Sequence, residues 1–349
     1  MPSSRSNPTP STSERSDVSY PPPPITDFSG LTAVITGGGS GMGRELVIQL
    51  SAAGCHVAMC DISQESMDET TALARSVAAD TVRVTSFVAD VADAAAMDAF
   101  ADHVRASLAT ASIDLLFNNA GIGGAGSFVN DDPAEWDRVF GVCWGGVLNG
   151  LRSFLPMLMA AERGHVVNTS SINGMWACLG PTGAHTSYSA AKFAVRGLTE
   201  ALNVDFRVNA PHLTASVVMP GHIGTQIARN SMIAMGLDPK TLSDAAVSEL
   251  RAAIERTGID LSGASDEDIR NLMQMRVELF ENAAPTTAAQ AATAILDAVK
   301  SGEWRILVGP DAVVLDQALR ERPTEVYTDA FMDDLQARGH FTGGGLIRP

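Results

Sequence analysis

A glycine-rich run between an apolar segment and a helical one most constrains how this chain of 349 residues can fold. Residues 36–43 read TGGGSGMG, directly after the apolar run 31–36 and before a helical pattern that ends at Gly54. In a strand–loop–helix unit, such glycines allow a tight turn and let the backbone approach a pyrophosphate, which the free N–H groups of the helix can bind. A purely structural turn is the alternative, but this context favours a dinucleotide site.

Apolar runs and helical patterns continue to alternate along the chain. The expected strands are 31–36, 56–60, 83–88, 113–117, 165–168, 214–219 and 305–308, and the expected helices are 43–53, 63–79, 92–109, 133–161, 188–206 and 287–301. Buried strands that alternate with helices predict an α/β fold, a doubly wound (Rossmann) parallel sheet of about seven strands with helices on both faces. Ligands of such folds bind beyond the carboxyl ends of the strands.

Three segments depart from this alternation. Residues 1–27 form a Pro/Ser-rich tail that we expect to be disordered, because it cannot bury enough apolar surface to offset chain entropy. The remaining residues, 28–349, predict one catalytic domain. Within it, residues 225–285 are interpreted as a helical lid insertion over the substrate, and residues 311–349 as a C-terminal extension.

Two helices are expected in the insertion, at 241–257 and 266–282, with Ser243 and Ser265 as caps. Four methionines cluster in this insertion: Met232, Met235, Met273 and Met275. Methionine adapts to irregular apolar surfaces. The cluster therefore predicts either an apolar wall for a bulky substrate or simple docking of the helices, and both readings stay open.

Charge and composition exclude several classes of partner. With 24 Lys and Arg against 40 Asp and Glu, the net charge is −16, which lacks the basic surface that nucleic-acid binding needs. No apolar run is long enough to span a membrane, and no secretory signal opens the chain, so we expect a cytoplasmic protein. The four cysteines show no metal-ligand spacing, and no metal site is predicted.

The expected second strand ends near Asp61, which lies 18 residues after Gly43. A carboxylate in this place accepts the hydroxyls of the adenosine ribose and repels a 2′-phosphate. Neither Ser40 nor residues 62–63 offer a basic side chain for that phosphate, so NAD is favoured over NADP. The alternative role of Asp61 is to cap the next helix, for which Ser63 competes.

Tyr188 and Lys192 lie four residues apart on an expected helix and therefore share one face. A lysine ammonium beside a phenol is expected to lower the phenol pKa from about 10 toward neutrality, which yields a usable base. The pair alone is a common pattern. Upstream, residues 166–171 read VVNTSS and present hydroxyls at the end of a strand.

Taken in order, these motifs resemble those of the short-chain dehydrogenase/reductases. The shared motifs are TGxxxGxG at 36–43, Asp-Val at 90–91, NNAG at 118–121, the strand-end serines, Tyr188-x-x-x-Lys192 and Pro-Gly at 220–221. The resemblance covers about residues 30–310. It implies that Ser171 orients the substrate oxygen, that Tyr188 is the acid/base, and that Lys192 lowers the tyrosine pKa and holds the nicotinamide ribose.

The resemblance also implies a set of cofactor-binding residues. They are Thr36, Gly37, Ser40, Gly41 and Met42 at the phosphates, Asp61 and Ile62 at the adenosine ribose, Asp90 and Val91 at the adenine, Asn118, Ala120, Gly121, Tyr188 and Lys192 at the ribose and nicotinamide, and Pro220, Gly221, Ile223 and Thr225 at the carboxamide.

Three departures from the family pattern stand out. Cys143 occupies the place of an asparagine thought to anchor a proton-relaying water, so either another group holds that water or turnover is impaired. Ser171 lies 17 residues before Tyr188, and the extra stretch 178–185 predicts part of the substrate mouth, where His185 either contacts substrate or is simply solvated. The insertion is the third departure.

The function implied is an NAD-dependent oxidoreductase that interconverts a secondary alcohol and a ketone, on a bulky apolar substrate. Alternatives are an NADPH-dependent carbonyl or ketoacyl reductase, and a protein of the same fold that binds NAD without turnover. The expected partners are a small-molecule alcohol or ketone and further copies of the chain, as a homodimer or homotetramer.

Overall fold

The computed structural model describes residues 20–124, 126–178, 185–255 and 260–340. Its centre is one sheet of seven parallel strands in the order β3-β2-β1-β4-β5-β6-β9. The strands are β1 (Thr32–Thr36), β2 (His56–Asp61), β3 (Val84–Val88), β4 (Leu115–Asn118), β5 (Gly164–Thr169), β6 (Leu213–Pro220) and β9 (Arg305–Val308). The order reverses between β1 and β4, which is the doubly wound arrangement that the sequence predicted.

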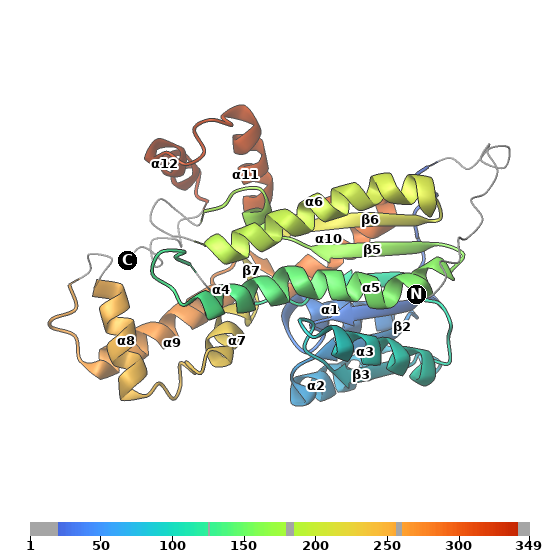
Figure 1. Ribbon diagram of the computed structural model, residues 1–349, viewed down its shortest axis with the longest axis horizontal. Coiled ribbons are helices and arrows are strands. Elements are labelled where there is room, and N and C mark those ends of the chain that lie inside the picture. Colours follow the sequence, from blue (N-terminus) through green and yellow to red (C-terminus); the bar gives the residue numbers. More distant parts are fainter. Residues whose placement is uncertain (1–19, 125, 179–184, 256–259, 341–349) are drawn as a thin grey trace, which may run out of the picture.

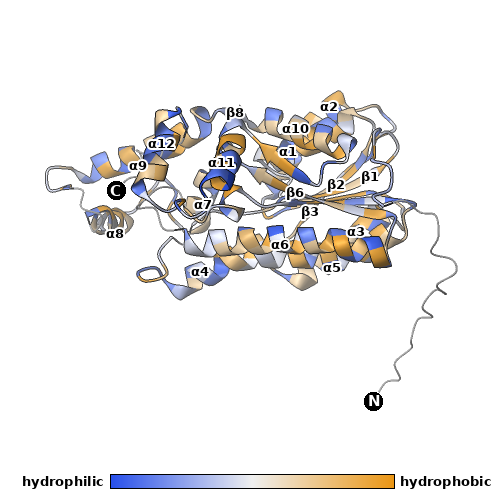
Figure 2. Ribbon diagram, turned by 90° about the horizontal axis from the view of Figure 1, so that it is seen from above, coloured by the Kyte–Doolittle hydropathy of each residue, from blue (hydrophilic) through white to orange (hydrophobic). Residues whose placement is uncertain are grey.

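Helices cover both faces of the sheet (Figures 1 and 2). One face packs against α1 (Gly41–Ala52), α2 (Gln64–Val77) and α10 (Ala288–Ser301), and the other against α3 (Ala94–Ser107), α5 (Gly146–Met159) and α6 (Thr186–Asn209). Successive side chains of β1 enter opposite layers, since Ala33 and Ile35 pack in the first and Val34 in the second. Burial on both faces explains why the strands read as continuous apolar runs.

The expected helical region 133–161 consists of two helices joined by a π-helical turn. Asp132 caps α4 (Pro133–Phe140), the turn η1 spans Gly141–Gly145, and α5 follows without a loop. A π-helical turn widens the backbone ladder, and such turns are frequent at functional sites. Here the turn contains Cys143.

The insertion follows β7 (Ile223–Gly224), contains α7 (Ile227–Ala234), α8 (Asp244–Glu255) and α9 (Asp266–Asn282), and ends just before β8 (Thr286–Thr287). Figure 1 shows α8 and α9 projecting beyond the sheet, away from the strands. The predicted cap Ser265 forms a capping box with Asp268, and the Ser243 hydroxyl accepts the backbone N–H of Ala246. These helices have an apolar cluster of their own: Leu242, Ala246, Val247, Ile269 and Met273.

The C-terminal extension contributes α11 (Pro310–Glu321) and α12 (Asp329–Ala337). These helices pack on Ile172 and Trp176, just after the strand-end serines. The Trp176 indole donates a hydrogen bond of 2.7 Å to the Val326 carbonyl. The extension therefore lies beside the substrate side of the site.

The predicted boundary of the N-terminal tail at residue 27 is wrong. Ile25 is 5% exposed and Phe28 only 1% exposed, both within the core layer of α1 and α10. Tyr20 bonds Asn203 on α6, and the Arg207 guanidinium lies over its ring. These apolar side chains offset the cost of ordering the segment. Residues 1–19 and 341–349 lie outside the described residues.

Candidate active site

The glycine-rich loop connects β1 to α1 at the carboxyl edge of the sheet. Gly37 and Gly41 have φ values of +69° and +53°, a region that suits glycine. A Cβ at Gly43 would lie 2.0 Å from the Gly37 carbonyl oxygen, so only glycine permits this turn. Ser40 is the N-cap of α1 but makes no capping bond, which leaves the first N–H groups of the helix available to an anion. Met42 packs on the core beneath.

The ends of β1 and β4 are joined through Thr36. Its hydroxyl accepts the backbone N–H groups of Asn119 and Ala120, each at 3.0 Å. The Asn119 side chain in turn donates to the Thr36 carbonyl at 3.1 Å. The Asn119 side chain therefore stabilises the contact between the ends of β1 and β4, a role that the sequence did not predict.

Asp61 ends β2 and faces the loop. Its Oδ2 accepts the Gly39 N–H at 3.0 Å, and its Oδ1 accepts the Ser63 N–H at 3.2 Å. Ser63, rather than Asp61, caps α2. Next to it, Ile62 is 67% exposed and free to contact a ligand.

Arg44 is a basic side chain near Asp61 that sequence reasoning missed. Its guanidinium donates to the Gly39 carbonyl at 2.7 Å and to the Thr70 hydroxyl at 3.0 Å, and it pairs with Glu69 at 2.9 Å. These bonds hold Arg44 between the glycine-rich loop and α2.

Asp90 and Val91, which are predicted to contact the adenine, follow β3. The Asp90 carboxylate accepts the Ala92 N–H at 2.9 Å, and Val91 is buried against Gly146 of α5. Asn149 donates to the Val91 carbonyl at 2.9 Å. The Asn149 amide is thus bonded to the backbone here and does not replace the asparagine that the family pattern has at position 143.

The side chain of Asn118 differs from its predicted role at the cofactor. It is 2% exposed, and its amide donates to the Asn168 side chain at 2.8 Å, between β4 and β5. A Cβ at Gly150 of α5 would lie 2.1 Å from Asn118 Oδ1, so the side chain points into the protein. The Asn118 side chain therefore connects β4 with β5. Ala120 and Gly121 follow at the carboxyl edge of the sheet, where the cofactor is predicted to bind.

Ser171, Tyr188 and Lys192 come together although they arise from two separate elements. Ser171 follows β5, and its hydroxyl accepts the backbone N–H of Asn173 at 3.1 Å and lies close enough to the Tyr188 phenol to influence its pKa. Tyr188 and Lys192 lie on the first turns of α6, with Lys192 Nζ 5.4 Å from the centre of the tyrosine ring. Lys192 Nζ also donates to the Thr169 carbonyl at 2.8 Å.

Burial dominates the ionisation of this group. It raises the pKa of Tyr188, the nearby Cys143 thiol raises it further, and the Ser171 hydrogen bond lowers it. Burial also lowers the pKa of Lys192. The predicted lowering of the Tyr188 pKa by Lys192 is therefore not the controlling effect here, because the ammonium lies over the ring and bonds Thr169.

The segment after β6 contains the residues that are predicted to contact the carboxamide. Pro220 ends that strand, the Gly221 N–H donates to the Val308 carbonyl at 2.9 Å, and Ile223 pairs with Thr286. A Cβ at Gly41 would lie 3.1 Å from Thr225 Cγ2, which brings this segment against the glycine-rich loop. All the predicted cofactor residues thus lie along one edge of the sheet, apart from the inward side chain of Asn118.

The insertion touches the same edge through α7. The Asn230 amide donates to the Ser40 hydroxyl at 3.3 Å, and the Ser231 hydroxyl accepts the Gly123 N–H at 2.7 Å. Helix α7 therefore contacts both the glycine-rich loop and the segment that follows the NNAG motif.

A family model for short chain dehydrogenases matches residues 31–235. The chain belongs to the short-chain dehydrogenase/reductase family. SadH of Mycobacterium tuberculosis is 38% identical over 220 residues, which cover 63% of this chain and 76% of SadH. Levodione reductase of Leifsonia aquatica is 34% identical over 229 residues, 64% of this chain and 80% of that protein.

Solved structures agree with this assignment. A short chain dehydrogenase/reductase from Burkholderia phymatum in complex with NAD superimposes with a TM-score of 0.67 at 26% identity, over 86% of this chain and 96% of that one. This short-chain dehydrogenase/reductase is thus an oxidoreductase for CH–OH groups. The open N-terminus of α1 and the glycine cradle fit a nicotinamide dinucleotide.

Cys143 of this dehydrogenase is fully buried in the π-helical turn. Its thiol donates to the Ile122 carbonyl at 3.2 Å. A Cβ at Gly121 would lie 3.7 Å from Cys143 Sγ and 3.5 Å from Lys192 Nζ, so the thiol borders the catalytic group.

We expect Cys143→Asn to preserve or raise turnover, because its amide can donate to Ile122 and adds a polar group near Lys192. If the larger side chain lacks partners, stability should fall by about 1–3 kcal/mol. The pH–rate profile and the melting temperature, with Cys143→Ala as control, separate these effects. A large loss of rate in both variants at unchanged stability would instead assign the sulfur a direct role.

The substrate side carries a row of aromatic rings. Trp136 stacks on Phe140 at 5.1 Å between ring centres, flanked by Phe128 and Trp144. The Ser187 hydroxyl donates to the Trp136 carbonyl at 2.6 Å, which fixes this row beside Tyr188.

His185 stands at the start of α6, and its ring lies 5.3 Å from the Tyr188 ring. Burial lowers the pKa of His185 to about 4, so it is neutral at pH 7. Its position beside Tyr188 agrees with the substrate-contact reading, whereas residues 179–184 of the predicted mouth lie outside the described residues. Among the described residues, no group of acidic, histidine or cysteine side chains could hold a metal ion, and no helix is long and apolar enough to cross a membrane.

Proposed function

We propose that this protein is an NAD-dependent oxidoreductase that interconverts a secondary alcohol and a ketone, with a bulky apolar compound as substrate. The observation that carries the proposal is the group formed by buried Ser171 and Lys192 and half-buried Tyr188, beside Gly121. When bound, the nicotinamide would supply the hydride chemistry. Ser171 would orient the substrate oxygen and Tyr188 would exchange a proton with it.

The preference for NAD rests on Asp61 and Arg44. The Asp61 carboxylate faces the place where a ribose 2′-phosphate would add negative charge. Arg44 is a cation near Asp61. Because its guanidinium is already bonded to Gly39, Thr70 and Glu69, we do not expect it to bind a 2′-phosphate.

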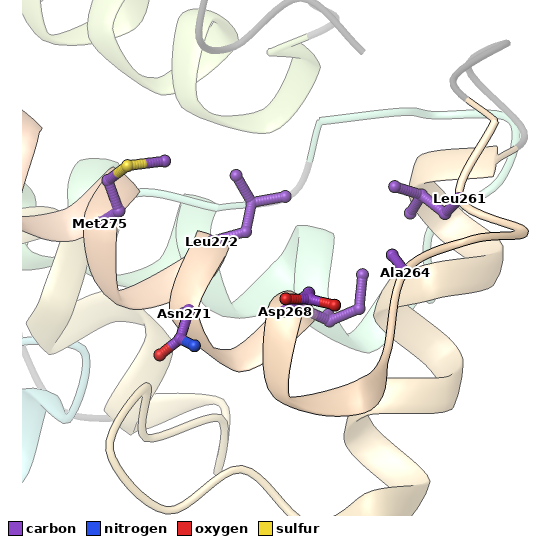
Figure 3. A pocket seen from close by; sticks show the side chains of 7 residues that line it. Leu261, Ala264, Asp268, Asn271, Leu272 and Met275 are labelled. Atoms are coloured by element: carbon purple, nitrogen blue, oxygen red, sulfur yellow. The ribbon is translucent and has the colours of Figure 1, made fainter.

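A bulky apolar substrate is supported by the aromatic row beside Tyr188 and by the insertion. A groove of about 320 Å³ with a mainly apolar lining runs along α9. In Figure 3, Leu272 and Met275 extend from α9 toward the side on which Leu261 lies. Met273 is instead 5% exposed in the insertion's own core, with Met232 packed against it. Docking thus accounts for Met232 and Met273, and we assign the wall to Met275.

We expect Met275→Ala to raise KM several-fold for bulky apolar alcohols and to leave short ones unchanged, because each buried CH₂ contributes about 0.8 kcal/mol. The matched control is Met273→Ala, which should lower stability by about 2–5 kcal/mol without changing chain-length preference. Equal KM values of Met275→Ala and the unmodified enzyme on all alcohols would remove this wall from the proposal.

Reduced-cofactor formation with NAD and NADP, across steroid, terpene, aryl and short-chain alcohols, tests the proposed function. We expect turnover with NAD and a bulky secondary alcohol. Faster ketone reduction with NADPH would favour the carbonyl-reductase alternative. Cofactor binding without turnover of any compound would favour a non-catalytic protein.

We also infer a homodimer or homotetramer, which sedimentation equilibrium would test. Support comes from apolar side chains exposed on α5 and α6: Leu155, Met159, Phe193, Val204 and Val208. An association of copies through these helices would bury them. A cytoplasmic location stays a prediction.

A further inference from the structure

Asp311 of the C-terminal extension lies against the segment that closes the nicotinamide side. It stands in the first turn of α11 and is only 4% exposed. Its Oδ2 accepts the backbone N–H of His222 at 2.6 Å. The carboxylate also fills the space beside Gly221, since a Cβ there would lie 2.1–2.3 Å from its three atoms.

His222 extends this contact to the insertion. Its Nε2 bonds the Phe280 carbonyl at 2.8 Å, and because a carbonyl only accepts, the ring proton is on Nε2. The imidazole also packs on the Phe280 ring at 4.5 Å between centres. One residue of the Pro-Gly segment therefore connects α11 with α9.

The second carboxylate oxygen, Oδ1, is buried and finds no hydrogen-bond partner among the described residues. A buried carboxylate with an unpaired oxygen is destabilising by itself, and an apolar side chain of similar size would avoid that cost. The burial of Asp311 is explained if its carboxylate is needed to fix the conformation of the backbone at Gly221 and His222.

We propose that Asp311 is a positioning residue for the nicotinamide half of the cofactor. It holds the backbone at Gly221 and His222, which precede Ile223 and Thr225, in the conformation that receives the carboxamide. The C-terminal extension is then part of the cofactor site. This inference rests on the proposed nicotinamide-dependent function.

The test compares binding of NAD and of ADP-ribose, which lacks the nicotinamide, by calorimetry on the full chain. Asp311→Ala should weaken NAD at least fivefold and leave ADP-ribose within twofold. Asp311→Asn retains an oxygen that accepts the His222 N–H, and it should bind both ligands like the unmodified protein. The matched control is Asp316→Ala on the same helix, whose carboxylate pairs with Arg305, and it should change neither affinity.

Equal loss of NAD and ADP-ribose binding in Asp311→Ala, or no loss of NAD binding, would overturn the inference. Should that variant fail to fold, Asp311→Leu provides a second test, because it keeps a side chain of similar size, removes the acceptor of the His222 N–H and predicts the same NAD-specific loss. If the unmodified protein binds neither NAD nor NADP, the proposed function itself fails, and this outcome is distinct from equal losses in the variant.

Discussion

Replacement of Tyr188 by phenylalanine is expected to lower kcat by about 10²–10⁴-fold, the usual contribution of general acid–base transfer. The variant removes the phenol oxygen, which we propose exchanges the proton with the substrate, and keeps the ring that packs near Lys192 and His185. NAD affinity should therefore change little. Steady-state kinetics and calorimetric NAD titration measure the two effects separately.

The pH dependence follows from the raised pKa of Tyr188. Alcohol oxidation needs the phenolate, whose fraction grows as pH rises toward that pKa, so its rate should climb from neutral into alkaline solution. Ketone reduction needs the protonated phenol and should hold until alkaline pH. Tyr188→Phe should lose both dependences. If this variant retained most of its activity, the base would have to be another group.

Ser171→Ala is the informative companion to this variant. Its hydroxyl lowers the Tyr188 pKa by hydrogen bonding, so its removal should shift the oxidation profile toward higher pH. A purely structural role for Ser171 would lower stability and leave the profile in place.

Most features that the sequence predicted correctly depend on residues that lie close together in the chain. Tyr188 and Lys192 share a face because helix geometry requires it, and the glycine-rich loop follows β1 because the apolar run and the helix flank it. The alternation of strands and helices predicted a doubly wound parallel sheet of about seven strands. The methionines show the limit of a composition argument. Residues 273 and 275 lie about 200° apart around a helix, so they had to face different sides.

Contacts between distant segments could not be predicted. The NNAG motif places Asn118 near the cofactor, but its side chain direction depends on Asn168, 50 residues away. The position of the Arg44 side chain depends on its bonds to Glu69 and Thr70. The role of Asp311 depends on its hydrogen bond to His222, which lies 89 residues earlier in the chain. Ile25 lies in a Pro/Ser-rich segment, so its sequence context predicts a disordered tail. Its burial depends on packing against distant residues of the core layer of α1 and α10.

We predict that the unmodified protein binds NAD at least tenfold more tightly than NADP. Asp61→Asn is expected to reduce this ratio of affinities at least tenfold. The amide has the size of the carboxylate, and its oxygen can still accept the Gly39 N–H, so the glycine-rich loop should keep its conformation. Loss of the negative charge removes repulsion of the 2′-phosphate. It also weakens the bonds to the ribose hydroxyls, since hydrogen bonds to charged groups contribute about 1.5–3 kcal/mol.

Titration of both cofactors into the unmodified protein, Asp61→Asn and Asp90→Asn decides this prediction. Asp90 lies on the adenine side, where NAD and NADP are identical, so its variant should weaken both equally and keep their ratio. A gain in NADP affinity confined to Asp61→Asn would assign selectivity to the charge at the end of β2. If the unmodified protein binds both cofactors alike, the carboxylate does not select, and its bonds to Gly39 and Ser63 have only a structural role.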